Sequence, residues 1–177
     1  FFLTVIGTTG TFVVCSSGPY ATVYQAQELE SRLDVAVKIY DKEQNALQGF
    51  LREAEAARYI AKHYPYGRPR NILPVVEVIT PELAIVTPLC DLGTVHKKIR
   101  REGKLSVLQT AAVLSDLCDG LEASHAAGVL HRDVKPSNIL LQKTDLKRED
   151  EFEIDPTAKH THALLSDYDI SLCNSTV

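Results

Sequence analysis

The sequence contains no methionine and no tryptophan among its 177 residues, and it begins with Phe1 and Phe2. Since no initiator methionine is present, we expect the chain to be a piece of a longer product. The length fits one globular unit at about 150 residues per domain. Hydrophobic residues make up 45% and charged residues 24%, which is ordinary for a folded domain.

An excess of positive charge is also missing. The chain has 19 lysines and arginines against 23 aspartates and glutamates, a formal net charge of −4. Nucleic-acid-binding domains usually carry a basic surface. We therefore expect no nucleic-acid partner.

Paired cysteines and metal-binding histidine patterns are absent. None of the four cysteines belongs to a C-x-x-C pair, which argues against a disulfide scaffold and a cysteine-built zinc site. The histidines show no H-E-x-x-H spacing, and His160 and His162 fall in a polar stretch where a metal site is not expected. We expect buried, reduced thiols in a cytoplasmic or nuclear protein, at Cys15, Cys90, Cys118 and Cys173.

Residues 1–27 carry no charged side chain, but they do not resemble a membrane span. A span needs about 20 predominantly apolar residues, and threonine, serine, glycine and proline interrupt this stretch repeatedly. A signal peptide would also begin with a basic region, which is missing. We interpret the stretch as β-strands and expect no membrane association.

The first ninety residues read as strands with one helix. Strands are predicted at 13–15, 22–24, 35–40, 75–79 and 83–87, separated by turns at 17–19 and 80–82. Apolar residues at intervals of three and four predict a helix over 46–62.

Alternation assigns the two faces of the strand at 35–40. One face carries Val35, Val37 and Ile39, and the other carries Ala36, Lys38 and Tyr40.

Beyond a connector at 88–93 the pattern becomes helical. A long helix is predicted from Ser106, its N-cap, to Ala127, with Gly128 as the C-cap. Loop and strand follow over 134–141, and the polar, aperiodic residues 142–162 are predicted to be a surface insertion. One apolar stripe of the helix is formed by Val107, Ala111, Leu114, Cys118 and Leu121.

Residues 131–140 read HRDVKPSNIL and carry the chemistry of the chain. The pattern H-R-D-x-K-P-x-N resembles the catalytic loop of eukaryotic-type protein kinases. Residues 35–38 resemble the V-A-x-K strand of the family, 50–53 its αC helix, and 165–169 its D-F-G segment.

The resemblance implies an α+β, two-lobed kinase-like fold, here as a partial protein kinase domain over 1–177. Residues 1–87 would form the β-rich N-lobe with one helix, 88–93 the hinge, and 94–177 the first part of a mainly helical C-lobe.

The partner of Lys38 follows from helical spacing. A lysine in a cleft needs a carboxylate, and the helix offers Glu53 and Glu55. Glu53 shares its face with Phe50 and Ile60, whereas Glu55 lies between two arginines. We therefore predict a Lys38–Glu53 pair, with Glu55 on the surface.

The resemblance also implies the catalytic roles. Asp133 would accept the substrate hydroxyl proton, Lys135 would steady the transferring phosphoryl group, and Asn138 and Asp167 would hold Mg²⁺. The lysine of D-x-K-P-x-N indicates a serine/threonine kinase. His131 is expected to be a packed core residue. Arg132 resembles the arginine that binds the phosphate of a phosphorylated activation loop. This resemblance would imply an activating kinase as a partner.

The nucleotide-covering loop departs from the family pattern. Residues 16–21 occupy the G-x-G-x-x-G position, and only Gly18 is retained. Adenine is expected between Val23 and Ala36 on one side and Leu140 on the other. Its hydrogen bonds would go to the hinge at Pro88 and Cys90, with Thr87 guarding the rear of the pocket. The predicted ATP-binding residues are Ser16, Gly18, Ala21, Val23, Ala36, Lys38, Glu53, Thr87, Pro88, Cys90 and Leu140.

A second departure is Asp169, which replaces the glycine of D-F-G. Aspartate tolerates left-handed dihedrals better than most residues, and it adds negative charge near the metal site. The leading hypothesis is a serine/threonine protein kinase that uses ATP and Mg²⁺ and acts on protein substrates.

Two alternatives remain. One is a pseudokinase, a nucleotide-binding or scaffolding module of the same fold, which Ser16, Ala21 and Asp169 favour. The other is a small-molecule phosphotransferase, which the complete H-R-D-x-K-P-x-N disfavours. The isolated residues 1–177 are expected to be inactive.

Overall fold

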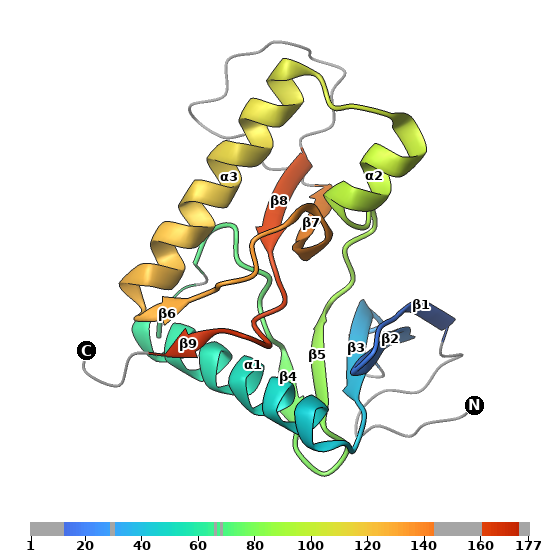
Figure 1. Cartoon of the computed structure of the whole chain (residues 1–177), viewed down its shortest axis with the longest axis vertical. Helices are drawn as coiled ribbons and strands as arrows, with labels where there is room; N and C mark the ends of the chain where they lie inside the picture. Colours follow the sequence, from blue (N-terminus) through green and yellow to red (C-terminus); the bar gives the residue numbers. More distant parts are fainter. Residues whose placement is uncertain (1–12, 29–30, 66, 68, 144–160, 174–177) are drawn as a thin grey trace.

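The computed structural model describes residues 13–28, 31–65, 67, 69–143 and 161–173. Its elements form two lobes, with the larger sheet and one helix below and two helices above in the orientation of Figure 1. An extended segment runs from the end of the sheet up to the helices. This arrangement agrees with the α+β, two-lobed fold predicted from the sequence.

The lower lobe is built on an antiparallel sheet in the order β1-β2-β3-β5-β4. The predicted strands are present, and the turn predicted at 80–82 joins the last two. The strands are β1 (Val13–Ser17), β2 (Ala21–Gln27), β3 (Asp34–Tyr40), β4 (Glu77–Ile79) and β5 (Ala84–Pro88).

The predicted alternation of β3 is confirmed. Val35 and Val37 are buried in one cluster together with Val86, and Ile39 packs against it. Tyr40 lies in a different cluster with Phe50 of the helix. The two faces of β3 therefore contact different parts of the core, and Lys38 shares the face that turns toward the helix.

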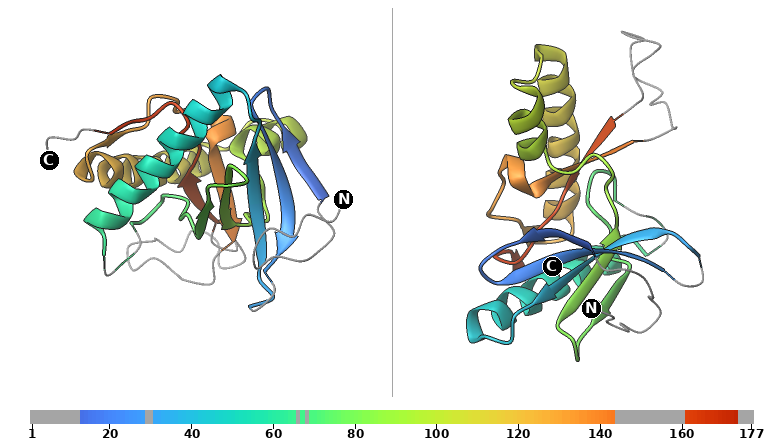
Figure 2. Two further views of the ribbon diagram at one scale, coloured as in Figure 1. Left: turned by 90° about the horizontal axis from the view of Figure 1, so that it is seen from below. Right: turned by 90° about the vertical axis from the view of Figure 1, so that its right-hand side faces the viewer.

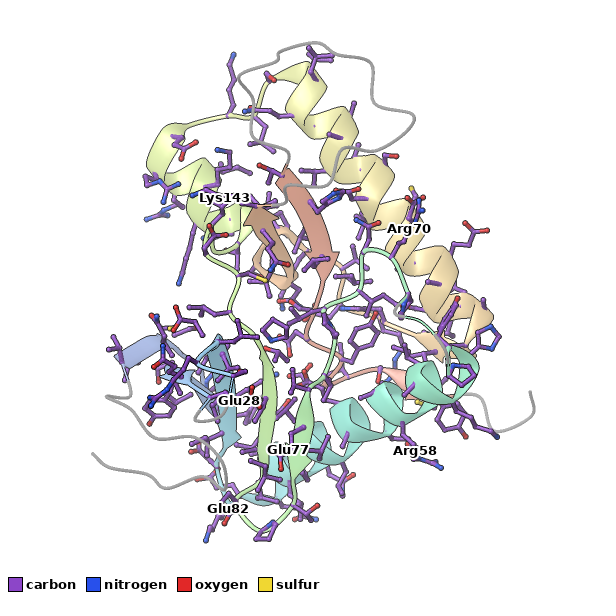
Figure 3. The ribbon with its side chains drawn as sticks, turned by 180° about the vertical axis from the view of Figure 1, so that it is seen from behind. Glu28, Arg58, Arg70, Glu77, Glu82 and Lys143 are labelled. Atoms are coloured by element: carbon purple, nitrogen blue, oxygen red, sulfur yellow. The ribbon has the colours of Figure 1, made fainter. Side chains whose placement is uncertain are left out.

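Helix α1 (Gln44–His63) extends the predicted helix by two residues at its start and one at its end. It lies along the sheet, as the view from below in Figure 2 shows. Glu53 is on its buried face and Glu55 is exposed, as the spacing predicted. Arg58 projects from the outer side of the helix in Figure 3, so the charged stripe of α1 faces solvent.

The upper lobe contains short strands beside two helices. β6 pairs with β9, and β7 pairs with β8, both antiparallel. Helix α3 packs against β8. The elements are α2 (Val95–Glu102), α3 (Val107–Ala126), β6 (Val129–Leu130), the 3-10 turn η1 (Pro136–Asn138), β7 (Ile139–Lys143), β8 (Thr161–Leu165) and β9 (Leu172–Cys173).

The predicted N-cap of α3 is confirmed. Ser106 accepts a hydrogen bond from the Gln109 N–H at 3.1 Å, and the Gln109 side chain accepts one from the Ser106 N–H at 2.9 Å. This is a capping box. The other end needs a correction: the C-cap is Ala127, and Gly128 follows it with φ 76°, the position after the cap that favours glycine.

The predicted apolar stripe of α3 is not its buried face. Val107 is 85% exposed and Leu114 is 52% exposed, whereas the buried positions are Asp116, Gly120 and Ser124. Packing explains the difference. A Cβ on Gly120 would lie only 2.5 Å from the carbonyl oxygen of Asn71, so the helix approaches the neighbouring backbone on its small and polar side.

The predicted insertion at 142–162 is too long by two residues at each end. β7 continues to Lys143 and β8 begins at Thr161, with Gln142 paired to His162 and Lys143 paired to Thr161. The middle of the insertion, 144–160, lies outside the described residues, and so does His160. Both strands keep the catalytic segments at their ends in register.

The cysteines are reduced as predicted, but only Cys90 is buried. Cys118 is exposed on the outer side of α3, and Cys15 and Cys173 are half-buried. Among the helices of the described residues, none is long and apolar enough to cross a membrane.

A short segment at 71–73 joins the two lobes behind the sheet. The Leu165 N–H donates to the Asn71 carbonyl at 2.8 Å, and the Leu73 N–H donates to the Leu165 carbonyl at 2.9 Å. The Asn71 side-chain amide also donates to the Ala163 carbonyl at 2.9 Å. The backbone between α1 and β4 is thereby fixed to β8, two residues before Asp167.

Candidate active site

Lys38 is the meeting point of the two lobes. Its Nζ lies 2.8 Å from Glu53 Oε2 of α1 and 2.6 Å from Asp167 Oδ1 of the upper lobe. The lysine side chain is 19% exposed. The predicted Lys38–Glu53 pair therefore forms, and a second carboxylate from a distant part of the chain joins it.

Two opposing effects act on the pKa of Lys38. Burial lowers it, but the Glu53 and Asp167 carboxylates together outweigh burial and hold the pKa well above the ordinary value of 10.5. The ammonium group is thus charged at every physiological pH. A charged group between two carboxylates at the edge of a cleft is suited to binding a phosphate oxygen.

The catalytic loop brings three polar side chains together. The Lys135 ammonium contacts Asp133 Oδ2, and the Asn138 amide donates to the same oxygen and to the Asp133 carbonyl, both at 3.0 Å. The hydrogen bond from Lys135 lowers the pKa of Asp133 below 3.8. The carboxylate is therefore ionised and able to accept a proton at neutral pH.

His131 is 1% exposed, as predicted for a packed core residue. Its Nε2 lies 2.8 Å from the Ser166 carbonyl, and its Nδ1 accepts from the Asp133 N–H at 3.1 Å. The imidazole thus connects the loop that carries Asp133 to the segment that carries Asp167.

Two functional positions adopt left-handed backbone conformations. Arg132 has φ 65° and Asp167 has φ 71°. Such values are unfavourable for residues other than glycine and often occur at active sites. The Arg132 guanidinium is held by the next segment, because its Nε donates to the Ile170 carbonyl at 2.7 Å.

Asp169 increases the negative charge of the site. Carboxylate oxygens of Asp133, Asp167 and Asp169 lie within 4.8 Å of one another. Burial and the neighbouring Asp167 raise the pKa of Asp169 above 3.8. Oxygen ligands and mutual repulsion between carboxylates fit a hard divalent cation such as Mg²⁺. Asn138 is 4% exposed, and its Nδ2 is occupied by Asp133, so its Oδ1 is the atom suited to a metal.

The aromatic residue of the D-F-G position is Tyr168, and it is buried. Its hydroxyl lies 2.7 Å from the Ser124 hydroxyl of α3, and its ring is 4.6 Å from the His131 ring. Burial raises the pKa of Tyr168 to about 12. The segment is therefore fixed between α3 and the catalytic loop in the arrangement that directs Asp167 toward Lys38.

The nucleotide-covering loop follows β1 and leads into β2. Ser16 pairs with Val23 across the hairpin, the Gly18 N–H donates to the Ala21 carbonyl at 2.9 Å, and Tyr20 is exposed at the tip. A Cβ on Gly18 would meet only the Ala21 oxygen, at 3.6 Å. The turn therefore does not itself require glycine.

Lys97 of α2 connects the upper lobe to β1, next to this loop. Its Nζ donates to the Cys15 carbonyl at 3.2 Å. A bulge between Val14 and Ser16 interrupts the β1–β2 register at Cys15, and bulges leave one residue out of the ladder. The stem of Lys97 passes over Gly93, 3.6 Å from the position of a Cβ there.

The residues predicted to surround adenine lie on three strands. Val23 is paired with Lys38, and Ala36 is paired with Thr87, so these residues share neighbouring positions of the sheet. Leu140 comes from β7 of the other lobe and forms a bridge with Thr94.

In the hinge, Pro88 still belongs to β5. The Leu89 N–H is occupied by the Asp34 carbonyl at 3.2 Å, which is consistent with Cys90 as the donor to a base.

A cavity of about 160 Å³ opens behind Thr87. Thr87 is almost buried. The cavity extends between α1 and the segment at 166–168, and Glu53 and Asp167 lie on its wall. Thr87 lies on the wall of this cavity together with Glu53 and Asp167; its place beside adenine stays a prediction.

Sequence reasoning gave no role to several residues that the structure places in the site. Tyr40 contacts both members of the Lys38–Glu53 pair, and its position two residues after Lys38 was a usable signal. The contacts of Ser124 with Tyr168 and of Lys97 with β1 left no comparable sign in the sequence.

The site combines a lysine paired with a helix glutamate, a loop aspartate beside a lysine and an asparagine, and a further aspartate after a short strand. This is the residue set of the protein kinase type. The comparison with protein families agrees: residues 14–154 match the model described as "Protein kinase domain". The chain belongs to the protein kinase family.

Several relatives that the chain resembles are named serine/threonine-protein kinases. The chain is 33% identical over 150 residues to CBL-interacting serine/threonine-protein kinase 7 of Arabidopsis thaliana, covering 81% of this chain and 34% of the relative. It is 34% identical over 114 residues to serine/threonine-protein kinase PkaA of Streptomyces coelicolor, covering 62% and 20%. The match to PknK of Mycobacterium tuberculosis is 34% over 128 residues, covering 70% and 11%. The chain thus spans about a third or less of the length of these relatives.

Proposed function

We propose that this chain transfers the γ-phosphoryl group of ATP, with Mg²⁺, to serine or threonine hydroxyls of protein substrates. The observation that carries the proposal is the position of Lys38, with its Nζ 2.8 Å from Glu53 and 2.6 Å from Asp167. This arrangement connects the phosphate-binding lysine to both lobes without a ligand. The named serine/threonine kinases among the relatives support the choice of acceptor.

Each polar residue of the site has a separate role in the proposed reaction. Lys38 binds phosphate oxygens of the nucleotide and aligns them. Asp167 and Asn138 are the residues that would hold Mg²⁺, which supplies neutralisation of the phosphate charge when bound. The Asp133 carboxylate, ionised because of Lys135, orients the substrate hydroxyl and accepts its proton. Lys135 then faces the transferring group with its positive charge.

The adenine site follows from the strand positions. Val23 and Ala36 would lie on one face of the base and Leu140 on the other, with backbone hydrogen bonds to Pro88 and Cys90. Thr87 limits the depth of the pocket. Ser16, Gly18 and Ala21 would cover the phosphates from the loop above.

The segment after Asp169 suggests control by phosphorylation. The Arg132 guanidinium is bonded to the carbonyls of Ile170 and Ser171, and a phosphate group added nearby would compete for it. We therefore propose an activating protein kinase as a partner of this protein.

The test measures nucleotide binding and transfer in the full-length protein that contains this chain. We expect Mg²⁺-dependent ATP binding and the appearance of phosphoserine or phosphothreonine in a protein substrate. Asp133→Asn should abolish transfer and retain binding, whereas Asp41→Asn, at an exposed position of the other lobe, should leave both unchanged.

Two results would contradict the proposal in different ways. ATP binding with no transfer by the wild-type protein would make it a pseudokinase, the outcome that Ser16, Ala21 and Asp169 favour. Transfer to a small molecule but to no protein would identify a small-molecule phosphotransferase. Residues 1–177 alone are expected to be inactive, because α3 exposes large apolar side chains such as Val107 and Leu108, which favour aggregation in water.

A further inference from the structure

Tyr40, the last residue of β3, contacts both members of the Lys38–Glu53 pair. Its hydroxyl donates a hydrogen bond to Glu53 Oε2, the same oxygen that lies 2.8 Å from Lys38 Nζ. Its ring carries the Lys38 ammonium over one face, 4.7 Å from the centroid. One side chain therefore touches the anion through a polar tip and the cation through an aromatic face.

The ring of Tyr40 is tightly held. It is 3% exposed and packs edge-on against Phe50 of α1, with centroids 5.8 Å apart and planes at 69°. Both residues belong to one buried cluster. Because the ring is packed in this way, its hydroxyl stays in one place, and the hydrogen bond to Glu53 comes from a well-held side chain.

Gly49 provides the room for this ring. A Cβ on Gly49 would lie 3.3 Å from Tyr40 Cε1, closer than ordinary contact. Glycine inside a helix costs about 0.5–1 kcal/mol relative to alanine. The second turn of α1 thus carries a glycine, which is unfavourable in a helix, at the point where a larger side chain would push Tyr40 away from Glu53.

The protonation state of the Tyr40 hydroxyl suits its role as a hydrogen-bond donor. Burial, and then the Glu53 carboxylate, raise the pKa of Tyr40 well above 10. The phenol therefore keeps its proton at neutral pH. The ring also offers the Lys38 ammonium a cation–π contact that is little screened by water.

Lys38 is shared between two carboxylates, and this makes the orientation of Glu53 important. Asp167 lies closer to Lys38 than Glu53 does. If Glu53 turned away, Lys38 would be left with Asp167, the residue that must also serve a metal. A second donor on Glu53 Oε2 opposes that change.

We propose that Tyr40 is a positioning residue of the phosphoryl-transfer site, whose hydroxyl orients Glu53 and whose ring supports Lys38 so that the lysine presents its charge to the nucleotide phosphates. This inference rests on the proposed kinase function. It predicts an effect specific to phosphates, because Tyr40 pairs across the sheet with Ala21 of the phosphate-covering loop, whereas the adenine positions Val23 and Ala36 pair with Lys38 and Thr87.

The test compares Tyr40→Phe with the wild type in the full-length protein, using ATP and adenosine as two probes. Phenylalanine keeps the ring and its packing and removes the hydroxyl alone. We expect the ATP dissociation constant to rise about fivefold and kcat to fall about tenfold, the scale of one hydrogen bond to a charged group. Adenosine affinity should change less than twofold.

The matched control is Tyr59→Phe. Tyr59 is a half-buried tyrosine of the helix that carries Glu53, and its ring lies beside Arg58. We expect no change in kcat or in either dissociation constant. Equal weakening of ATP and adenosine by Tyr40→Phe would indicate general damage to the fold and would overturn the inference, as would no effect on either.

A double-mutant cycle connects the effect to Glu53. In a Glu53→Gln background, Tyr40→Phe should change ATP affinity less than twofold, because the charged acceptor is already gone. Independent, additive effects would overturn the inference. A wild-type protein that binds ATP and transfers no phosphoryl group would refute the proposed function alone, and the ATP-to-adenosine comparison would still decide the role of Tyr40.

Discussion

Asp169 packs against Gly49: a Cβ built on the helix glycine would lie 3.5 Å from the Cβ of Asp169. The aspartate that replaces the family's glycine therefore sits where α1 has no side chain. Gly49 is an unusual residue for the interior of a helix, and Asp169 is an unusual residue for a D-F-G segment. These two residues lie against each other. They bring the segment that carries Asp167 directly against the helix that carries Glu53.

Gly49→Ala is expected to lower the rate of phosphoryl transfer about tenfold. The added methyl would press on Tyr40 at 3.3 Å and would lie in ordinary contact with Asp169 at 3.5 Å. The free energy of unfolding should change by less than about 1 kcal/mol, since the better helix propensity of alanine offsets the crowding. Steady-state kinetics and urea denaturation measure the two quantities. Gly67→Ala is the control, because a Cβ there would meet no atom within 4 Å. Unchanged kinetics in Gly49→Ala would contradict the importance of this contact.

Asp169→Asn is expected to raise the thermal midpoint at pH 7. Burial and Asp167 raise the pKa of Asp169 above 3.8, so the folded protein binds this proton more tightly than the unfolded chain does. The stability from Asp169 is fully present below the unfolded pKa and is lost as pH rises through the folded pKa. Asparagine removes that loss.

We therefore expect a midpoint about 2 °C higher at pH 7 and no difference between the two proteins below about pH 3.8. Differential scanning calorimetry across this pH range provides the measurement, and Asp41→Asn, an exposed aspartate, serves as the control. A lower midpoint at pH 7 would show that the Asp169 carboxylate stabilises the fold.

Gly120→Ala is expected to destabilise the protein by about 3 kcal/mol. The new Cβ would lie 2.5 Å from the Asn71 carbonyl oxygen and 3.2 Å from its carbon, and neither backbone atom can move without disturbing the bonds to Leu165. Overpacking of this kind costs roughly 1–3 kcal/mol. Urea denaturation measures the change. Glu122→Ala, exposed on the same helix, should stay within about 0.5 kcal/mol, and an equally small effect at Gly120 would refute the close approach.

Ser106→Ala is expected to cost about 1 kcal/mol of stability, because it removes one half of the capping box on α3. Ser115→Ala tests whether the loss is specific to the cap, since Ser115 is an exposed serine inside the same helix where alanine is the better helix former. Chemical denaturation should show opposite signs for the two variants. Equal effects would mean that the cap contributes nothing.

Local patterns predicted the parts of the site that depend on one element. Alternation along β3 placed Lys38 and Tyr40 on one face, and helical spacing selected Glu53 over Glu55. Ser106 was likewise predicted as the N-cap of α3, although its partner Gln109 was not.

What could not be predicted depends on contacts between elements. The stripe from Val107 to Leu121 is as apolar as a buried face, yet α3 buries Asp116, Gly120 and Ser124 instead, because the neighbouring backbone needs a small residue and hydrogen-bond partners. Asp116, for example, accepts from the Ala163 N–H at 2.7 Å. For Tyr40 the sequence carried half of the signal: alternation along β3 places it on the face of Lys38, but the hydrogen bond to Glu53 depends on which turn of α1 lies opposite.

The bonds of Asn71 and Leu73 to Leu165 have a mechanical consequence. The main chain joins the lobes at two separate places, the connector at 88–93 and this backbone seam, and side chains join them elsewhere, at Lys38–Asp167 and Lys97–Cys15. Two fixed points define a line, so the cleft can widen by rotation about that line, while twisting across it would break the seam. Residues near the axis, such as Asp167, would move little during such a rotation, and the tip of the loop at Tyr20 would travel farthest. A nucleotide could then enter and leave while the metal-binding carboxylate stays almost still.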